Sequence, residues 1–303
     1  MQHMNPLVNN MSISSPRRYQ PYSSKPGVCM IESKEGNLFL GIRVESASFP
    51  TTISAVQSGV IQCLMHGEQP AVVFYQDPKL SGLEYWINSL SIEAEQISEQ
   101  ELNNKAKKLQ EYNQQKLDSS TLNLNQISNP NQATGLNSVK PIPLEVFGLS
   151  KLSRDMHDLK EETNKSHPIF SKIQMEQFKQ ALVDVCKLAI CPESNFPVGA
   201  LLWTNLGIFP GVNVEFHDWS LGLCAERTAL ISALSHGADK FYGIFVHAIY
   251  GDLSTPCGAC RQILSEHMLF SKLYCLHKDY TWSEYFIHDL LPNAFYTDFL
   301  AKF

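Results

Sequence analysis

The chain has 303 residues, 44% of them hydrophobic and 18% charged, which fits a globular protein with room for two modest domains. Its formal net charge is −6, and the part from Gln174 onward carries eight Lys or Arg against thirteen Asp or Glu, so we expect a small-molecule substrate and no nucleic acid partner. No apolar run approaches the roughly 18 residues of a membrane span, and the N-terminal segment lacks the apolar core of a secretory signal, so we expect a cytoplasmic location, no membrane partner and reduced cysteines.

Polar residues dominate the middle of the chain. Residues 91–115 are compatible with an exposed helix, although their low apolar content argues against stable packing. Residues 117–140 have little apolar periodicity, and their content of Gln, Asn and Ser is typical of a solvated loop. We therefore expect a polar insert at about residues 91–140.

The C-terminal part alternates helical and strand patterns. Apolar residues at nearly 3.6-residue spacing predict helices, and short apolar, β-branched runs predict strands. The predicted elements are, in chain order, a buried helix over 175–190, strands over 198–204 and 207–216, a helix over 222–237 that ends at Gly237, and a strand inside a sheet over 242–250. The segment 254–264, "STPCGACRQIL", follows this last strand.

The sequence contains an internal repeat. Residues 36–64 align with residues 206–234 with one extra residue near Asn37, and a single register over this length favours duplication over chance. The matched pairs are Phe39 with Phe209, Gly41 with Gly211, Val44 and Glu45 with Val214 and Glu215, and Ala55 with Ala225.

The two copies differ in residues that can carry chemistry. The first copy has Ser54 and Val56 where the second has Cys224 and Glu226, and no Cys-x-x-Cys follows Cys63. We therefore expect one copy with an active site and one without.

Three cysteines of the second copy form a candidate metal site. Cys224 begins a predicted helix, and Cys257 and Cys260 follow a buried strand, in the arrangement Cys-x32-Cys-x2-Cys. Structural zinc normally has four protein ligands, so three thiolates leave one position open for water. Two other interpretations stay open at this point: a redox pair, which the lack of thioredoxin-like surroundings disfavours, and a structural site closed by a fourth thiol. The candidates for that fourth thiol are Cys186, Cys191 and Cys275.

Glu226 favours the catalytic interpretation. It lies two residues after Cys224, in the first turn of the same predicted helix, where its carboxylate can act as a base toward a zinc-bound water. Arg227 and the helix N-terminus can offset the negative charge of three thiolates by donating hydrogen bonds and positive potential to the sulfurs. The alternative for Glu226 and Arg227 is a solvated charge pair.

The motifs "CAERTA" and "PCGACRQ", preceded by "FPVGALL" and "NVE", resemble the three-cysteine, homotetrameric branch of the cytidine deaminases, from about Gln174 to Leu300. The resemblance implies an α/β fold with a mixed sheet between helices in each copy. It also implies one Zn²⁺ per chain, held in the C-terminal copy by Cys224, Cys257 and Cys260, with Glu226 as the proton carrier.

Further roles follow from the resemblance. It implies that Asn213 and Glu215 bind the ribose hydroxyl, that Phe196 packs on the pyrimidine, and that Phe295 in "LLPNAF" lines a neighbouring active site. The alternatives are strand-end polarity for Asn213 and Glu215 and core packing for Phe295.

The chain departs from the family pattern at two positions. Glu193 stands where the family usually has Tyr, and Phe216 stands where Asn often follows the ribose-binding Glu. These departures bear on substrate preference and subunit contacts, not on the zinc chemistry.

We expect four segments along the chain. They are an N-terminal tail over 1–19, a degenerate cytidine-deaminase-like domain over 20–153 that contains the polar insert, a linker over 154–173, and a catalytic domain over 174–303.

The predicted activity is hydrolytic deamination of cytidine or deoxycytidine to the uridine counterpart and ammonia, as in pyrimidine salvage. A polynucleotide cytosine deaminase is an alternative, which the negative charge and the lack of a basic, aromatic stretch disfavour. A non-catalytic regulatory scaffold is another, which the intact motifs of the second copy disfavour. Because single-domain relatives form tetramers, a chain with two copies is expected to form a homodimer with four domains.

Overall fold

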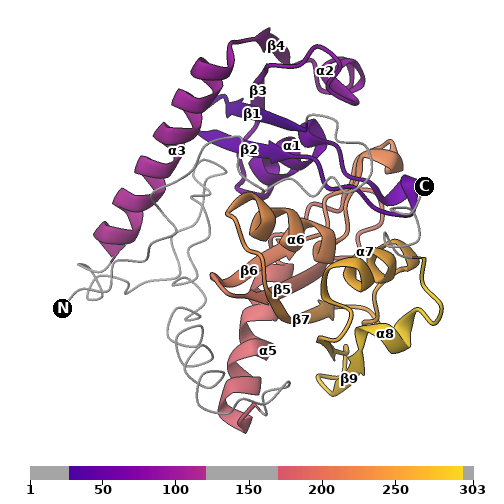
Figure 1. Cartoon of the computed structure of the whole chain (residues 1–303). Coiled ribbons are helices and arrows are strands. Elements are labelled where there is room, and N and C mark those ends of the chain that lie inside the picture. Colours follow the sequence, from indigo (N-terminus) through magenta and orange to yellow (C-terminus); the bar gives the residue numbers. More distant parts are fainter. Residues whose placement is uncertain (1–26, 121–169, 296–303) are drawn as a thin grey trace.

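The computed structural model describes residues 27–120 and 170–295, and each of these segments is built on one β-sheet (Figure 1). We call residues 27–120 the N-terminal half and residues 170–295 the C-terminal half. No helix in these two halves has the length and apolar character that crossing a membrane requires.

The C-terminal half contains a mixed sheet with the strand order β6-β5-β7-β8-β9. Its strands are β5 (Val198–Thr204), β6 (Gly207–Val212), β7 (Phe241–Ala248), β8 (Lys272–Leu276) and β9 (Trp282–Phe286). Only β7 and β8 are parallel neighbours, and they are joined through α7 (Gly258–Met268), as a parallel connection requires. The predicted strands form, although the one predicted over 207–216 ends at Val212, and β8 and β9 extend the sheet beyond them.

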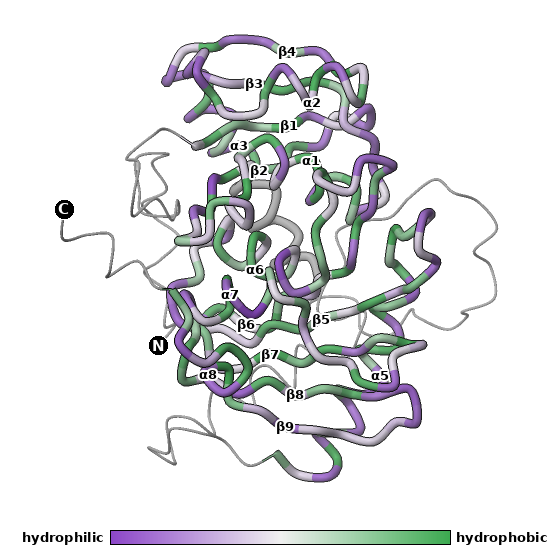
Figure 2. The backbone as a smooth tube through the Cα atoms, turned by 90° about the vertical axis from the view of Figure 1, so that its right-hand side faces the viewer, coloured by the Kyte–Doolittle hydropathy of each residue, from purple (hydrophilic) through white to green (hydrophobic). Residues whose placement is uncertain are grey.

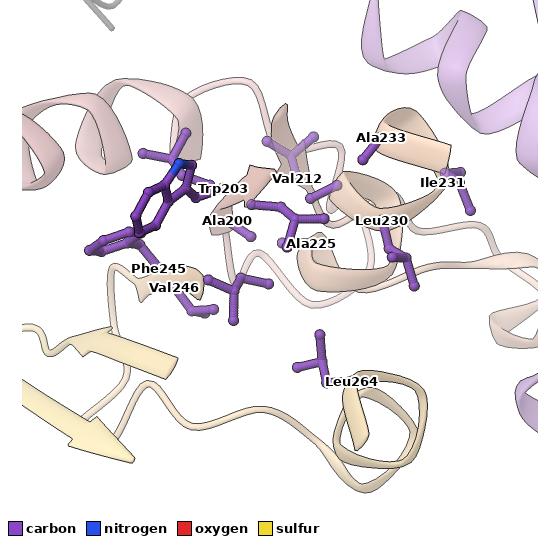
Figure 3. Close-up of a cluster of buried hydrophobic side chains, with 14 of the residues drawn as sticks. Ala200, Trp203, Val212, Ala225, Leu230, Ile231, Ala233, Phe245, Val246 and Leu264 are labelled. Atoms are coloured by element: carbon purple, nitrogen blue, oxygen red, sulfur yellow. The ribbon is translucent and has the colours of Figure 1, made fainter. Parts of the chain in front are cut away.

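Helices cover both faces of this sheet. On one face, α5 (Lys172–Cys186) places Phe178 in a stack on Phe245 of β7, with ring centroids 3.7 Å apart. The other face carries α6 (Ala225–Ser235), which ends at Gly237 with φ of 91°, as the sequence predicts. Figure 3 shows the two sides of this core, with Trp203 and Phe245 apart from the smaller residues of α6. The short α8 (Ile287–Leu290) follows β9.

The N-terminal half contains a second mixed sheet, with the order β2-β1-β3-β4. Its elements are β1 (Val28–Ser33), β2 (Leu38–Ile42), α1 (Ala55–Met65), β3 (Pro70–Tyr75), α2 (Leu83–Leu90), β4 (Glu93–Gln96) and α3 (Glu99–Ser120). As in the C-terminal half, two antiparallel strands are followed by a helix, a third antiparallel strand, a second helix and a parallel fourth strand. The predicted α/β fold with mixed sheets and flanking helices is confirmed.

Local contacts also match between the halves. A Cβ at Gly41 would lie 2.2 Å from the carbonyl oxygen of Ala55, and a Cβ at Gly211 would lie 2.3 Å from that of Ala225. Only glycine allows the helix to approach the strand so closely at either place. Each half also has a one-turn 3₁₀ helix: η2 (Phe49–Thr51) precedes α1, and η4 (Trp219–Leu221) precedes α6. These features agree with the internal repeat in the sequence.

The structure changes the predicted extent of the polar insert. Its first part is folded onto the N-terminal sheet, because β4 pairs with β3 and α3 packs on β1 and β2. Leu102 and Ala106 of α3 are buried against Met30 and Phe74. Two apolar residues one helical turn apart are enough to hold a mostly polar helix on a sheet, which a survey of overall polarity does not detect. Residues 121–140 lie outside the described residues.

The two halves pack through α1 and α6, which lie between the two sheets (Figure 2). Ile42, Ile61 and Met65 of the N-terminal half belong to the same buried cluster as α6 and β6. The hydroxyl of Ser235 donates a hydrogen bond of 2.9 Å to the side-chain oxygen of Gln62 across this contact. The main apolar cluster of the C-terminal half therefore extends into the N-terminal half, which also has two smaller clusters of its own.

Candidate metal centre and active site

Three thiols meet where two helices of the C-terminal half begin. Cys224 is the N-cap residue of α6, Cys257 is the N-cap residue of α7, and Cys260 lies in the first turn of α7. The Cys257 sulfur lies 3.6 Å from the sulfur of Cys224 and 3.6 Å from that of Cys260, and all three sulfurs lie within 4.8 Å of one another. The three cysteines singled out in the sequence are thus brought together.

The spacing of the sulfurs fits a tetrahedral metal site. Zinc–sulfur bonds of about 2.3 Å at tetrahedral angles place sulfurs roughly 3.8 Å apart. The predicted fourth-thiol candidates do not join the cluster: Cys186 and Cys275 are buried elsewhere, and Cys191 is half-buried outside it. Within the two described halves, no other group of His, Cys, Asp or Glu side chains comes close enough to hold a metal ion. The arrangement leaves the fourth position to a small molecule such as water.

Local electrostatics favour a negative charge on one of these sulfurs, because hydrogen bonding within the cluster raises the pKa of the Cys224 and Cys260 thiols. Hydrogen bonding to the sulfurs of Cys224 and Cys260 lowers the pKa of the Cys257 thiol, so the cluster retains a thiolate. The positive ends of α6 and α7 point at the same place. Nη2 of the Arg227 guanidinium lies 3.8 Å from the Cys224 sulfur. Nε of the same guanidinium is a buried donor without a hydrogen-bond partner among the described residues. Such a surplus of positive potential suits a centre that holds three thiolates.

Glu226 lies beside the three thiols in the interior. Its side chain is buried, with 4% of the residue exposed. Burial raises the pKa of its carboxyl group, and the negative charge of Cys257 raises it further. A carboxyl group beside the thiol cluster whose pKa is raised is suited to accept and return a proton, which general acid–base catalysis requires. The alternative of a solvated charge pair with Arg227 is therefore wrong.

A pocket of about 410 Å³ opens onto the cluster, and all of its lining residues belong to the C-terminal half. The sequence singled out seven of its lining residues: Phe196, Asn213, Glu215, Cys224, Glu226, Arg227 and Cys257. Phe216, which departs from the family pattern, also lines the pocket, and the lining is more apolar than polar. A pocket of this size with a few convergent polar groups is typical of a small-molecule site.

Asn213 and Glu215 have structural partners in the pocket wall. Asn213 accepts a hydrogen bond of 2.8 Å from the backbone N–H of Val198 and donates one of 3.0 Å to the carbonyl oxygen of Phe196. Glu215 accepts hydrogen bonds from the hydroxyl and backbone N–H of Ser194, at 2.6 and 3.0 Å. Both side chains are thus oriented before any ligand is bound, and the Asn213 side chain also fixes the segment that carries Phe196.

Two sequence-selected residues lie away from the pocket. Phe295 does not line it; its ring is half exposed, and its carbonyl oxygen accepts a hydrogen bond of 2.7 Å from Gln262 of α7. Glu193, at the first departure from the family pattern, lies 3.6 Å from Nδ1 of the exposed His217. The structure therefore brings neither into contact with the thiol cluster.

Sequence reasoning missed part of the pocket wall. Trp219, Leu253, Ser254 and Thr255 also line the pocket. The hydroxyl of Ser254 donates a hydrogen bond of 2.6 Å to the carbonyl oxygen of Leu276, which fixes the segment ahead of Cys257. The sequence signal that could have identified these four residues is their position beside the NVE and PCGAC motifs.

The corresponding place in the N-terminal half has no metal-binding character. Ser54 is the N-cap residue of α1, and its hydroxyl accepts the backbone N–H of Gln57. The apolar side chains of Val56, Leu80 and Trp86 belong to the buried cluster around it. This core includes the thiols of Cys29 and Cys63, but no group of three ligand side chains comes together in the described residues of this half.

Comparisons with known proteins point to one family. The family model described as the cytidine and deoxycytidylate deaminase zinc-binding region matches residues 172–276. A probable cytidine deaminase of Dictyostelium discoideum is 41% identical over 43% of this chain and 89% of its own length, and a cytidine deaminase of Mycoplasma genitalium is 36% identical over 41% and 97%. The crystal structure of a cytidine deaminase from Burkholderia pseudomallei, 39% identical, is matched over 38% of this chain and 97% of its own, with a TM-score of 0.35. The chain therefore belongs to the cytidine deaminase family and is a deaminase.

Proposed function

We propose that the C-terminal half holds one Zn²⁺ through Cys224, Cys257 and Cys260 and deaminates cytidine or deoxycytidine by hydrolysis. The observation that carries this proposal is the buried carboxyl group of Glu226 beside three clustered thiols, with Glu226, Cys224 and Cys257 lining one pocket. The relatives that cover the same part of the chain bear the name cytidine deaminase, which supports the nucleoside as substrate.

The chain's own groups carry the protons of the reaction. When bound, Zn²⁺ lowers the pKa of a water molecule at its open position. The carboxylate of Glu226 takes one proton from this water and gives it to N3 of the pyrimidine as the water oxygen bonds to C4. The same carboxyl group then takes the second proton and gives it to the amino group, which leaves as ammonia while the C4 carbonyl forms.

Residues of the pocket wall orient the nucleoside. Glu215 and Asn213 supply a carboxylate and an amide at one wall, where a ribose hydroxyl can donate to the carboxylate. Phe196 lines the same pocket and is 38% exposed, so its ring is available to the pyrimidine. The pair of buried Asn213 and half-buried Glu215 at this wall favours a nucleoside over a free base.

We also propose that the N-terminal half is a degenerate copy of the catalytic half within a domain of residues 20–153, followed by a linker over 154–173 and the catalytic domain over 174–303. The shared strand connectivity and the paired glycines at Gly41 and Gly211 support duplication. Its buried Trp86 and Val56, at the place of the metal centre, support a single Zn²⁺ per chain.

Zinc content tests the proposed ligands. The Cys257→Ser variant should lose most of its zinc together with its activity, because only two thiolates remain. Cys191→Ser is the matched control, since this thiol lies outside the cluster, and it should keep one zinc per chain. Metal analysis of the purified variants measures this, and full zinc occupancy in Cys257→Ser would mean that other ligands hold the ion.

Glu226→Gln tests the proton carrier. The amide keeps the shape of the carboxyl group but carries no proton, so kcat for cytidine should fall by about 10²- to 10⁴-fold with zinc retained. Glu176→Gln, at a largely exposed carboxylate on α5, should retain wild-type kcat. A cytidine-to-uridine assay measures both, and near-normal turnover in Glu226→Gln would contradict the mechanism.

Glu215→Ala tests ribose recognition. The loss of a charged partner for a buried hydroxyl costs on the order of 1 to 3 kcal/mol, so kcat/KM for cytidine should fall by about 5- to 150-fold. The ratio of cytidine to free cytosine use should fall with it. Ser194→Ala removes a hydrogen bond to the same carboxylate but leaves the charge, and should have the smaller effect. An unchanged ratio in Glu215→Ala would assign ribose binding elsewhere.

We propose that the protein assembles as a homodimer. Exposed apolar side chains gather at the pocket, where Trp219 and Leu253 line the wall and are 76% and 68% exposed. Apolar surface of this kind is typical of an interface. Light scattering of the purified chain should give twice the mass of 34.1 kDa, and a monomeric mass at micromolar concentration would contradict the proposal.

A further inference from the structure

The outer wall of the pocket is a loop that contacts both halves of the chain. We call residues 215–222 the wall loop; it contributes Glu215, Phe216, Trp219 and Gly222 to the pocket. At its ends the backbones of Val214 and Leu223 pair through two hydrogen bonds of 3.0 Å. Between these ends, the Asp218 side chain caps η4 within the loop itself.

The start of the wall loop is held in its own half, where the backbone N–H of Glu215 donates a hydrogen bond of 2.7 Å to the carbonyl oxygen of Ile190 and its carboxylate accepts from Ser194. The rest of the loop is supported by the N-terminal half. Leu221 is 6% exposed and belongs to the buried cluster formed by α1, α2 and the N-terminal sheet. The ring of Phe216 packs edge-on against Trp86 of α2, with centroids 5.5 Å apart and an interplanar angle of 81°. An edge-to-face pair of aromatic rings is a favourable and directional contact. The wall loop is thus anchored in the core of the other half.

Polar contacts reinforce this anchorage. The side-chain amide of Gln57, on α1, donates a buried hydrogen bond of 3.1 Å to the carbonyl oxygen of Leu221. The hydroxyl of Tyr85, on α2, donates to the carboxylate of Asp218. These two contacts hold the loop backbone and its capping side chain, while Trp86 holds the ring that faces the pocket.

The N-terminal half contributes no lining residue to the pocket, yet it holds one of the pocket walls. We propose that Trp86, Tyr85 and Gln57 are positioning residues for nucleoside binding in the C-terminal half. The expected effect on nucleoside binding rests on the proposed function. The expected effect on the wall loop rests on the contacts alone. It also gives Phe216 a role, since a ring at this position reaches Trp86 where the Asn usual in the family would not form an aromatic pair.

The position of the metal ligands predicts which kinetic constant changes. Cys224, Cys257 and Cys260 lie at the starts of α6 and α7, which pack in the core of the C-terminal half. Loss of the Trp86 ring loosens the wall loop without touching these ligands. Nucleoside binding should therefore weaken while zinc content stays at that of the wild type and kcat changes less than KM.

The test compares truncations on one helix. In the zinc-loaded full chain, Trp86→Leu should raise KM for cytidine by about 2- to 10-fold, which corresponds to the free energy of one aromatic pair. Trp86→Phe keeps an aromatic ring, so its KM should stay close to that of the wild type. Leu90→Ala is the matched control, because it removes apolar volume from α2 without removing the ring beside Phe216. An equal rise of KM in Leu90→Ala, or none in Trp86→Leu, would overturn the proposal. A double-mutant cycle with Phe216→Leu should show that the two effects are not additive.

A second measurement does not depend on activity. Amide hydrogen exchange of the zinc-loaded protein should be faster over residues 215–222 in Trp86→Leu and in Tyr85→Phe, and unchanged over α7. Tyr85 is 43% exposed, so its variant keeps the fold and decides the matter if Trp86→Leu does not fold. Unchanged exchange of the wall loop in Tyr85→Phe would overturn the proposal. A wild-type chain that does not deaminate cytidine would instead contradict the proposed function and leave the exchange result to decide the positioning roles.

Discussion

The metal centre depends on two helices that begin at the same point. Cys224 and Cys257 are both N-cap residues, so each sulfur sits where unpaired backbone N–H groups and the helix dipole stabilise negative charge. An N-cap is commonly a hydroxyl or carboxyl side chain that accepts a backbone N–H, yet neither thiol makes such a bond here. The sulfurs are left available to one another and to a metal ion.

The N-terminal half has a similar order of strands and helices but different residues at the starts of its helices. Ser54 occupies the N-cap position of α1 and does make the capping hydrogen bond, and Gly82 occupies that of α2. With Val56, Leu80 and Trp86 filling the space, the place of a reaction centre becomes part of a core. The apolar character of this half thus reflects its packing against the catalytic half as much as its own stability.

The sequence was sufficient for the elements with strong periodicity and for the motif residues. The helices around residues 175–190 and 222–237 and the strands at 198–204 and 242–250 formed where predicted, because their patterns match the faces they bury. It was insufficient for α3, whose attachment depends on Leu102 and Ala106 within a polar segment. It also could not place Phe216 beside Trp86, because their contact joins residues 130 positions apart and depends on how the halves pack.

The packing of the halves has a consequence for which amino-acid substitutions the protein can accept. The wall loop meets α2, and the matching loop of the N-terminal half meets α7 through Glu266, which accepts hydrogen bonds from the hydroxyl of Ser46 and the backbone N–H of Ala47. In a symmetric pair of identical subunits, one substitution alters both contacts at once. Here the two contacts are encoded by different codons of one chain. The loop beside the substrate can therefore adapt to a new ligand while its counterpart at α7 keeps the assembly intact.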